Sequence, residues 1–313
     1  MYAILLITLP IFSIIALGYG MVRFGLFAKP EMRVLGRFVI NLALPALVFK
    51  ALSERPIAEI ANARYLMAYA LGSLTVMGLM AGTAFFVRKK PLHVSAVLGM
   101  GVAMSNSGFI GYPIVSQFLG PPAAVALALC MVVENVIVLP TALTLAESGL
   151  RAGGKLRTVL PGIFLSLLKN PLILGILAGF ACALLDLRPP RPIARAIEMI
   201  ATASAPLALV VIGGTLVGLE LKGMLRGVSV VVASKLMLHP LAVALAFLLL
   251  PPVDPQLRTA AIAYASMPML SIYPIVALKY GQESFCAAAL LAATVSAFFT
   301  VSAVLWLLGG MPG

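Results

Sequence analysis

Charged side chains are scarce in this sequence: they make up 10% of its 313 residues, whereas 62% of the residues are hydrophobic. A soluble domain carries about 25% charged residues, so most of this chain lacks the polar surface that water requires. Apolar runs of roughly 20 residues, long enough to cross a bilayer as helices, follow one another along the chain. The composition therefore predicts an all-α polytopic membrane protein, with the first apolar run as a span and not a signal peptide.

Several chemical signatures are also missing. The sequence has no phosphate-binding Gly-rich loop, no metal-ligand cluster and no nucleophile–base pair, so it predicts neither an ATP-driven pump nor an enzyme, and no cofactor. An adjacent Asp-Asp pair is absent as well, which argues against a sodium–proton exchanger. The three cysteines, Cys130, Cys182 and Cys286, are isolated within apolar runs and are predicted to be buried free thiols.

Acidic residues are outnumbered by basic ones, 10 to 22, which gives a formal net charge of +12. In a membrane protein this excess indicates Lys and Arg in the loops on one side, so nucleic acid is not a predicted partner. Basic residues favour the connections at 23–37, 88–90, 151–157, 222–226 and 279 over those at 55–64, 188–195 and 258. The bias predicts that the first set is cytoplasmic and that both termini are extracytoplasmic.

We predict ten spans, separated by short connections that contain Pro or Gly. They lie at about 3–22, 34–52, 65–87, 92–118, 123–145, 163–185, 194–219, 225–250, 258–279 and 284–308.

An internal repeat relates the two halves of the chain. An offset of 161 residues takes Tyr-Pro-Ile-Val at 112–115 onto the same four letters at 273–276. The same offset takes Ser105 onto Ser266, Gly120 onto Gly281, Pro45 onto Pro206, Pro10 onto Pro171, Gly18 onto Gly179 and Pro91 onto Pro252. We interpret 1–150 and 151–313 as homologous halves of five spans each. Because five is odd, the halves would be inverted, as is typical of secondary transporters.

The fourth span of each half carries residues that interrupt helices. Pro113 and Gly108 in the first copy, and Pro268 and Pro274 in the second, predict unwound segments at 105–112 and 266–273. Such breaks are tolerated in a bilayer only beside protein or a watery cavity. Two broken helices in an inverted repeat would cross near the membrane centre, where helix N-termini suit an anion and freed carbonyls suit a cation. The alternative is that the prolines only kink tightly packed helices.

Polar residues at the two breaks are the candidates for substrate binding. Asn106 is the first choice, because its amide both donates and accepts. The full predicted set is Ser105, Asn106, Ser107, Gly108, Ser266 and Met267.

Glu134 and Lys235 are the charged residues deep inside predicted spans. An intramembrane charge is costly unless it is paired or hydrated, so each is a candidate for ion coupling or charge balance. The structural alternative is a salt bridge between them, or a lysine that neutralises carbonyls at a helix break. Asn135 could take part in coupling or hold helices together, and His239, beside a proline, favours a structural role.

At this point the sequence resembles a known family, the auxin efflux carriers, which include bacterial malonate-type transporters and are related to plant auxin carriers and bile acid sodium symporters. The resemblance covers essentially the whole chain. It rests on "NLALPALVFKAL" (41–52), "SNSGFIGYPIV" (105–115), "KNPLILGILAGF" (169–180), "SAPLALVVIGGTL" (204–216), "KLMLHPL" (235–241) and "KYGQE" (279–283).

The resemblance implies an elevator-type secondary carrier for an organic anion, with the fold of bile acid symporters and sodium–proton antiporters. Spans 1, 2, 6 and 7 would form a scaffold and a homodimer surface, and spans 3–5 and 8–10 a mobile core with crossed helices 4 and 9. The relatives' crossover Asn corresponds to Asn106, whereas the second crossover carries Ser266, Met267 and Pro268 in place of an amide. A bacterial inner-membrane location and coupling to H⁺ or Na⁺ are implied.

Two other functions stay open from the sequence. One is a sodium-coupled symporter of sterol acids or similar molecules. The other is a membrane sensor that binds a ligand at the same breaks without moving it, although the short loops leave no room for a signalling domain.

Overall fold

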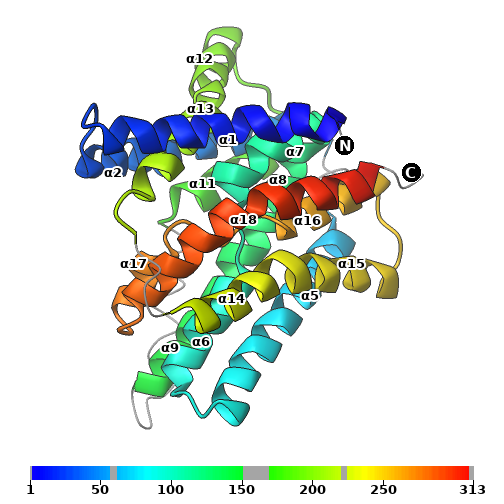
Figure 1. Cartoon of the computed structure of the whole chain (residues 1–313). Helices are drawn as coiled ribbons and strands as arrows, with labels where there is room; N and C mark the ends of the chain where they lie inside the picture. The colour runs from blue at the N-terminus through cyan, green and yellow to red at the C-terminus, as the bar shows by residue number, and fades with distance from the viewer. Residues whose placement is uncertain (1, 57–61, 151–168, 220–223, 310–313) are drawn as a thin grey trace. The chain divides into compact units, whose positions relative to one another are not determined.

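The computed structural model describes residues 2–56, 62–150, 169–219 and 224–309 (Figure 1). The regular elements within these ranges are all helical, and seven helices are long and apolar enough to cross a membrane. They are Ile4–Arg23, Lys29–Ser53, Ala63–Val87, Pro122–Leu150, Arg191–Thr215, Leu225–Leu249 and Glu283–Gly309. The described chain is therefore an all-α polytopic membrane protein, as its composition predicts.

Several spans are built from α-helices joined by short π-helical segments, labelled η. The N-terminal elements are α1 (Tyr2–Arg23), α2 (Lys29–Phe38), η1 (Val39–Ala43), α3 (Leu44–Ser53), α5 (Ala63–Gly82), η2 (Thr83–Val87), α6 (Leu92–Ala103), η3 (Ser107–Gly111), α7 (Tyr112–Leu119), α8 (Pro122–Val132), η4 (Val133–Val138) and α9 (Leu139–Leu150). The C-terminal elements are α11 (Pro171–Leu184), α12 (Arg191–Thr202), α13 (Ser204–Thr215), α14 (Leu225–Ala233), η6 (Ser234–Leu238), α15 (His239–Leu249), α16 (Pro255–Ala265), α17 (Tyr273–Leu278) and α18 (Glu283–Gly309).

The other three predicted spans are shorter helices or helix pairs. The predicted fourth span is α6, η3 and α7, and the predicted ninth is α16 and α17. The sixth is represented by α11, and its predicted beginning at 163–168 lies outside the described residues, as do the basic residues at 151–157 and Lys222.

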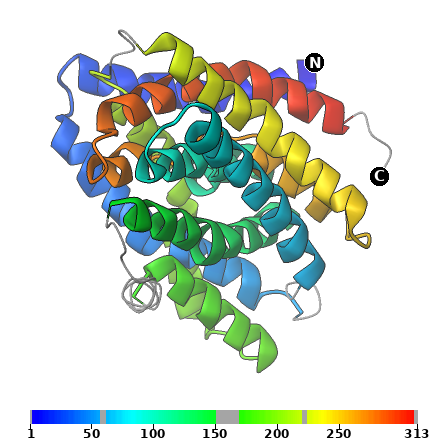
Figure 2. The same cartoon turned by 90° about the horizontal axis from the view of Figure 1, so that it is seen from below.

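The chain divides into two compact units. Unit 1 consists of Met1–Ala63, Gly108–Leu129 and Leu168–Gly218, and its main helix pairs are α1 with α13 and α3 with α11. Unit 2 consists of Arg64–Ser107, Cys130–Leu167 and Leu219–Gly313. Within unit 2, α6 packs on α9, and α14 and α17 pack on α18; Figures 1 and 2 show α14 (yellow) beside α18 (red).

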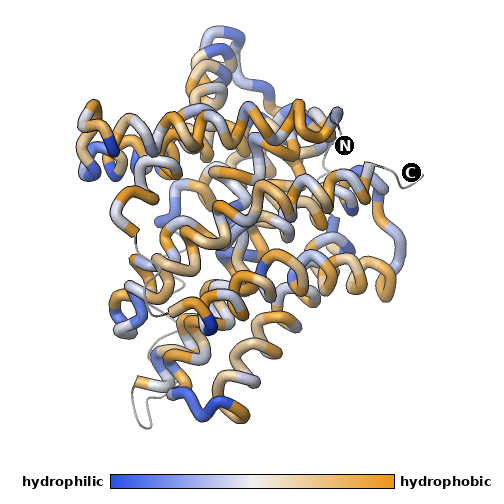
Figure 3. The backbone as a smooth tube through the Cα atoms, in the orientation of Figure 1, coloured by the Kyte–Doolittle hydropathy of each residue, from blue (hydrophilic) through white to orange (hydrophobic). Residues whose placement is uncertain are grey.

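Hydrophobic and more polar residues alternate along the helices in Figure 3. Several polar side chains are buried in the helical interior. Two of the cysteines, Cys130 and Cys286, are free and buried as predicted. The prediction was wrong for Cys182, which is only partly buried. It lies near the C-terminal end of α11, beyond Gly179, the last buried residue of that helix.

Close backbone contact in unit 1 depends on glycine. A Cβ atom added at Gly213 of α13 would lie 1.8 Å from the carbonyl oxygen of Ile15 in α1. Small residues permit such approach between membrane helices, where packing drives association. We therefore predict that Gly213→Ala lowers the free energy of unfolding by at least the ~1–3 kcal/mol typical of overpacked cores, measured as a lower melting temperature in detergent.

Gly78 of α5 is the matched control, because an added Cβ atom there meets nothing within 4 Å. Gly78→Ala should leave the melting temperature unchanged or raise it slightly, since alanine favours helix by about 1 kcal/mol. Equal melting temperatures for the two variants would contradict the packing argument.

Candidate functional site

The two interrupted helices meet inside unit 2. Helix α6 ends at Ala103 and α16 ends at Ala265. Beyond these ends, Ser105 forms an isolated antiparallel bridge with Met269, and the Asn106 N–H donates to the Pro268 carbonyl at 2.8 Å. A backbone donor that the first break releases is thus satisfied by the second break, as a low-dielectric interior requires.

The first break is shorter than the sequence predicts. Unwinding was expected over 105–112, but only Met104–Asn106 leave helical geometry, and Ser107–Gly111 form the π-helical segment η3 that runs into α7. Pro113 therefore lies inside a continuous helical run, and the helix N-terminus expected after Pro113 lies at Ser107 instead. The second break, from Ser266 to Ile272, matches its predicted range.

The helices that follow the breaks are short. Helix α7 has 8 residues and α17 only 6. So short a helix gives little macrodipole, and the anion site expected at the N-terminus after Pro274 has little support.

Glu134 is the acceptor at the centre of a buried hydrogen-bond network. Glu134 is 2% exposed. The Oε1 atom accepts from the hydroxyl of Tyr69 at 2.9 Å, from the hydroxyl of Ser107 at 2.9 Å and from the backbone N–H of Ser105 at 3.3 Å. One carboxylate therefore connects α5 and η4 with the first break.

Lys235 supplies the positive end of the same network and is fully buried. Its Nζ donates to the hydroxyl of Ser105 at 2.7 Å, to Nδ1 of His239 at 2.6 Å and to the carbonyl of Ala265 at 3.3 Å. Because an ammonium group only donates, Nδ1 of His239 accepts, and Nε2 is left to donate to the hydroxyl of Ser73 at 2.9 Å. Ser105 contacts both Lys235 and Glu134, so it joins the two charged groups.

The polar residues sit on unusual backbone. Ser107 lies in η3, Glu134 and Asn135 lie in η4, and Lys235 lies in η6. π-Helical segments are rare and occur frequently at functional sites, because they release the regular helical bonding and redirect side chains. Their coincidence with the mid-span charges singles out this region of unit 2.

The side chain of Asn106 carries a buried hydrogen-bond donor that the network does not use. The residue is 1% exposed, and its Nδ2 atom has no hydrogen-bond partner within the described part of the chain. A buried donor without a partner costs about 1–3 kcal/mol, and such a group requires an explanation. Since the amide lies between the paired breaks, a ligand with acceptor atoms is the explanation that its chemistry favours.

The other predicted site residues have local roles. The Ser266 hydroxyl donates to the Ala263 carbonyl at 2.7 Å, and Asn135 Nδ2 donates to the Met131 carbonyl at 2.8 Å within its own helix. Met267 is fully buried. Gly108 and Pro113 are buried and belong to unit 1, Pro268 is buried in the second break, and Pro274 is partly buried in the first turn of α17.

The sequence analysis missed Tyr69 and Ser73, which the structure places in contact with Glu134 and His239. Tyr65 was also missed, and its hydroxyl lies 2.9 Å from the sulfur of Cys130. The signal was present: Tyr65, Tyr69 and Ser73 recur every four residues in α5, which aligns polar tips on one helix face.

A separate ion pair in unit 2 lies at the end of α9. Lys279 pairs with Glu147, whose Oε1 also accepts from the hydroxyl of Tyr280 at 2.9 Å. Burial and this hydrogen bond to Glu147 raise the pKa of Tyr280, so the phenol stays a donor at neutral pH. The contacts join α9 to the end of the α17 segment.

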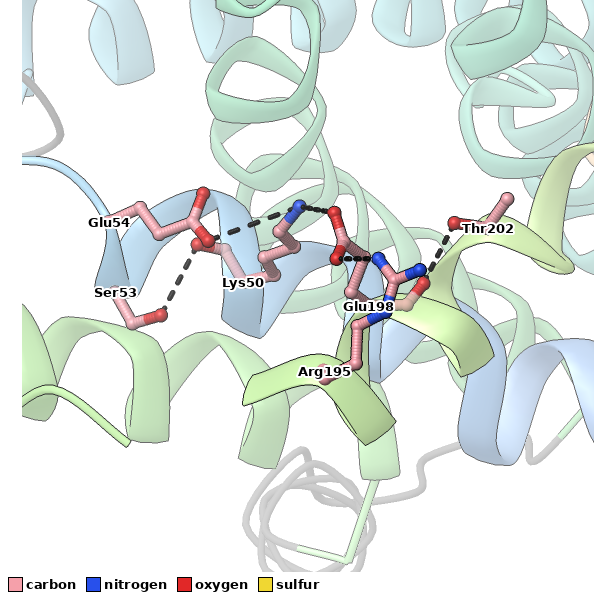
Figure 4. A network of polar contacts seen from close by, with 6 residues as sticks. All are labelled: Lys50, Ser53, Glu54, Arg195, Glu198 and Thr202. Carbon is pink, nitrogen blue, oxygen red and sulfur yellow. Dashed lines mark hydrogen bonds and ion pairs between the residues drawn. The ribbon is translucent and has the colours of Figure 1, made fainter. Parts of the chain in front are cut away.

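Unit 1 has a polar network of its own, between α3 and α12 (Figure 4). Glu198 accepts from Lys50 at 2.9 Å and from Arg195 at 2.7 Å, and Glu54 lies 4.0 Å from Lys50. Lys50 and Glu198 also line a pocket of about 730 Å³. These side chains are between 33% and 71% exposed, so this network is a weaker candidate for a binding site than the buried one in unit 2.

Comparison with known proteins places the chain in a family. Residues 3–307 match the family described as membrane transport proteins, so the chain belongs to this family, that of the auxin efflux carriers whose motifs it resembles. The chain is therefore an integral membrane transporter and not an enzyme.

Two relatives cover almost the whole chain. A protein of Rhizobium meliloti (strain 1021) named "Putative malonate transporter" is 32% identical over 98% of this chain and 97% of its own length. A protein of Escherichia coli (strain K12) named "Uncharacterized transporter YfdV" is 25% identical over 96% of this chain and 95% of its own length.

Proposed function

We propose that the protein is a secondary active carrier of a small organic anion, with a dicarboxylate such as malonate as the first substrate to test. The observation that carries the proposal is the buried Nδ2 of Asn106, which lacks a partner at the meeting point of the two breaks. A carboxylate oxygen would accept from it, and hydrogen bonds to charged groups are stronger than neutral ones. The name of the Rhizobium meliloti relative supports the substrate class.

Lys235 would attract the anion from the opposite side of Ser105. Its ammonium group donates to Ser105, which directly precedes Asn106. A fully buried lysine favours a negative partner, and Glu134 supplies one that a transported proton could neutralise. We assign Glu134 to coupling, with H⁺ as the first ion to test and Na⁺ as the second.

The proposed movement is an elevator, in which a core of spans 3–5 and 8–10 slides against a scaffold of spans 1, 2, 6 and 7 that also forms a homodimer. Support comes from the internal contacts, which gather α1–α3 and α11–α13 in unit 1 and α5, α6, α9 and α14–α18 in unit 2. The units depart from the proposed division at α7 and most of α8, which come from predicted spans 4 and 5 and belong to unit 1. The inverted repeat is supported by Gly120 and Gly281, equivalent under the offset, which have φ angles of 69° and 67° after α7 and α17. The basic-residue bias supports extracytoplasmic termini, and the bacterial relatives support an inner-membrane location.

Asn106→Ala tests the proposal directly. In liposomes, wild-type protein should take up radiolabelled malonate, and the variant should bind it roughly 10- to 150-fold more weakly, because a hydrogen bond to a charged group contributes about 1.5–3 kcal/mol. The melting temperature of the ligand-free variant should change little, since Nδ2 of Asn106 has no protein partner to lose.

Asn135→Ala is the matched control, because its amide bonds only to a carbonyl of its own helix. Uptake by this variant should stay within a few-fold of wild type. Malonate binding without flux would favour a sensor over a carrier, and uptake that survives Asn106→Ala would remove the amide from the site.

A further inference from the structure

Unit 2 contains a groove that the proposed transport site does not use. It has a volume of about 470 Å³ and lies between α5, α6, α14 and the beginning of α18. Its walls are mostly valine, leucine and methionine side chains. Leu79 and Leu238 line it and are 59% and 47% exposed, so the groove opens at the side of the helices where lipid would contact them.

Two basic residues lie at one end of this groove. Arg88 and Lys90 line it, and both follow η2 in the connection to α6. The hydrophilic connection is visible in blue at the lower end of the tube in Figure 3. Both side chains are exposed, and among the described ion pairs neither has an acidic partner.

The geometry of this basic end is fixed by the backbone. The N–H groups of Arg88 and Lys90 donate to the carbonyls of Thr83 and Ala84, each at 3.0 Å. Lys89 between them has a φ angle of 53°, a left-handed conformation that a non-glycine residue adopts only when its surroundings impose it. The turn lets Arg88 and Lys90 line the same groove although Lys89 does not.

The length of the groove matches one membrane leaflet. It extends along α5 and η2 from Val76 to Arg88, a distance of about 18 Å at 1.5 Å per residue. The hydrocarbon core of a bilayer is about 30 Å thick, so one leaflet spans about 15 Å. An acyl chain that follows the groove would therefore bring its headgroup to Arg88 and Lys90.

We propose that this groove binds an anionic phospholipid, with one acyl chain along Val76, Leu98 and Val102 and the phosphate on Arg88 and Lys90. The arginine fork and the lysine ammonium are both established phosphate-binding groups. Basic pockets between membrane helices recognise anionic headgroups in this manner. The apolar walls disfavour the small polar substrate of the transport site, so the two sites are chemically distinct.

The test uses the full-length protein in a neutral detergent. Titration with dioleoyl-phosphatidylglycerol should raise the melting temperature in a saturable manner, and dioleoyl-phosphatidylcholine should not. R88Q/K90Q should raise the half-saturating concentration of phosphatidylglycerol roughly 30-fold, because each basic residue near an anionic headgroup contributes about a factor of five to the affinity. Equal responses to the two lipids would overturn the proposal.

R33Q/R37Q is the matched control, because it removes two exposed basic residues of α2 that lie outside the groove. It should respond to phosphatidylglycerol as wild type does, and a loss equal to that of R88Q/K90Q would mean a diffuse charge effect and overturn the proposal. Leu98→Phe should weaken the lipid response while leaving both basic residues in place. Saturation by glycerol 3-phosphate alone would identify a free-phosphate site and overturn the lipid assignment.

Discussion

Glu134→Gln is expected to abolish the acceleration of malonate uptake by an imposed proton gradient. Glutamine keeps the shape of the side chain and an oxygen that accepts from Tyr69 and Ser107, but it cannot take up or release a proton. An ionised carboxylate near the centre of a membrane helix costs about 2.5–3.5 kcal/mol. If Glu134 couples transport to protons as proposed, its protonation would change the free energy of transport by enough to alter flux roughly 100-fold, and the variant would lose that difference.

The measurement compares uptake by proteoliposomes with and without a pH gradient, and separately with a sodium gradient. Glu54→Gln is the control. It removes the same charge, but the Glu54 side chain lies in unit 1 and is 62% exposed. It should keep the wild-type gradient dependence. If uptake by Glu134→Gln depends on the pH gradient as wild-type uptake does, Glu134 has no coupling role. If wild-type uptake responds to the sodium gradient alone, the coupling ion is Na⁺.

The sequence predicted the helices well because lipid leaves few alternatives. In a bilayer every backbone group needs a partner, so apolar runs must be helical. The predicted spans 225–250 and 284–308 correspond to Leu225–Leu249 and Glu283–Gly309. The helix break at 266–273 was predicted equally well, because Pro268 cannot continue a hydrogen-bonded helix.

The π-helical segments could not be predicted in the same way. Nothing in the local sequence of η4 or η6 excludes a regular α-helix, because β-branched and polar residues lower helix propensity only slightly and neither segment contains Gly or Pro. The two charged residues in them, Glu134 and Lys235, have partners up to 130 positions away in the chain. Only tertiary packing determines such contacts.

The candidate site was predicted only in part, because some of its residues are recognisable only from their tertiary contacts. Charge at mid-membrane depth marks Glu134 and Lys235 in any polytopic sequence, and the residues of the first break follow from the repeat. Tyr69 and Ser73 were not predicted, because a tyrosine or serine in a span is common and only its contact with a buried charge makes it informative. His239 was predicted to have a structural role, which stays a prediction; its contact with Lys235 was not foreseen.

The joint burial of Glu134 and Lys235 raises the question of which charge balances which. No direct ion pair joins them among the described residues, and both contact Ser105. A network of this kind is stable only when every member is satisfied, and removing one charge leaves the other buried without compensation. We therefore expect stability and the proposed transport to depend on the same pair of residues.

Lys235→Met is accordingly expected to destabilise the protein more than any other single substitution proposed. Removal of one member of a buried charge pair costs about 3–5 kcal/mol, which corresponds to a melting temperature lower by roughly 6 °C or more, measured at a fixed scan rate in detergent. Lys50→Met is the control and should cause a smaller decrease, because the Lys50 side chain is 33% exposed.

The double variant Glu134→Gln with Lys235→Met closes the cycle. Because it buries no unbalanced charge, it should melt above Lys235→Met alone, even though it contains one substitution more. Malonate uptake should nevertheless stay abolished, since the methionine cannot attract the anion. Additive losses of melting temperature in the double variant would mean that the two charges act independently, and that Ser105 does not couple them.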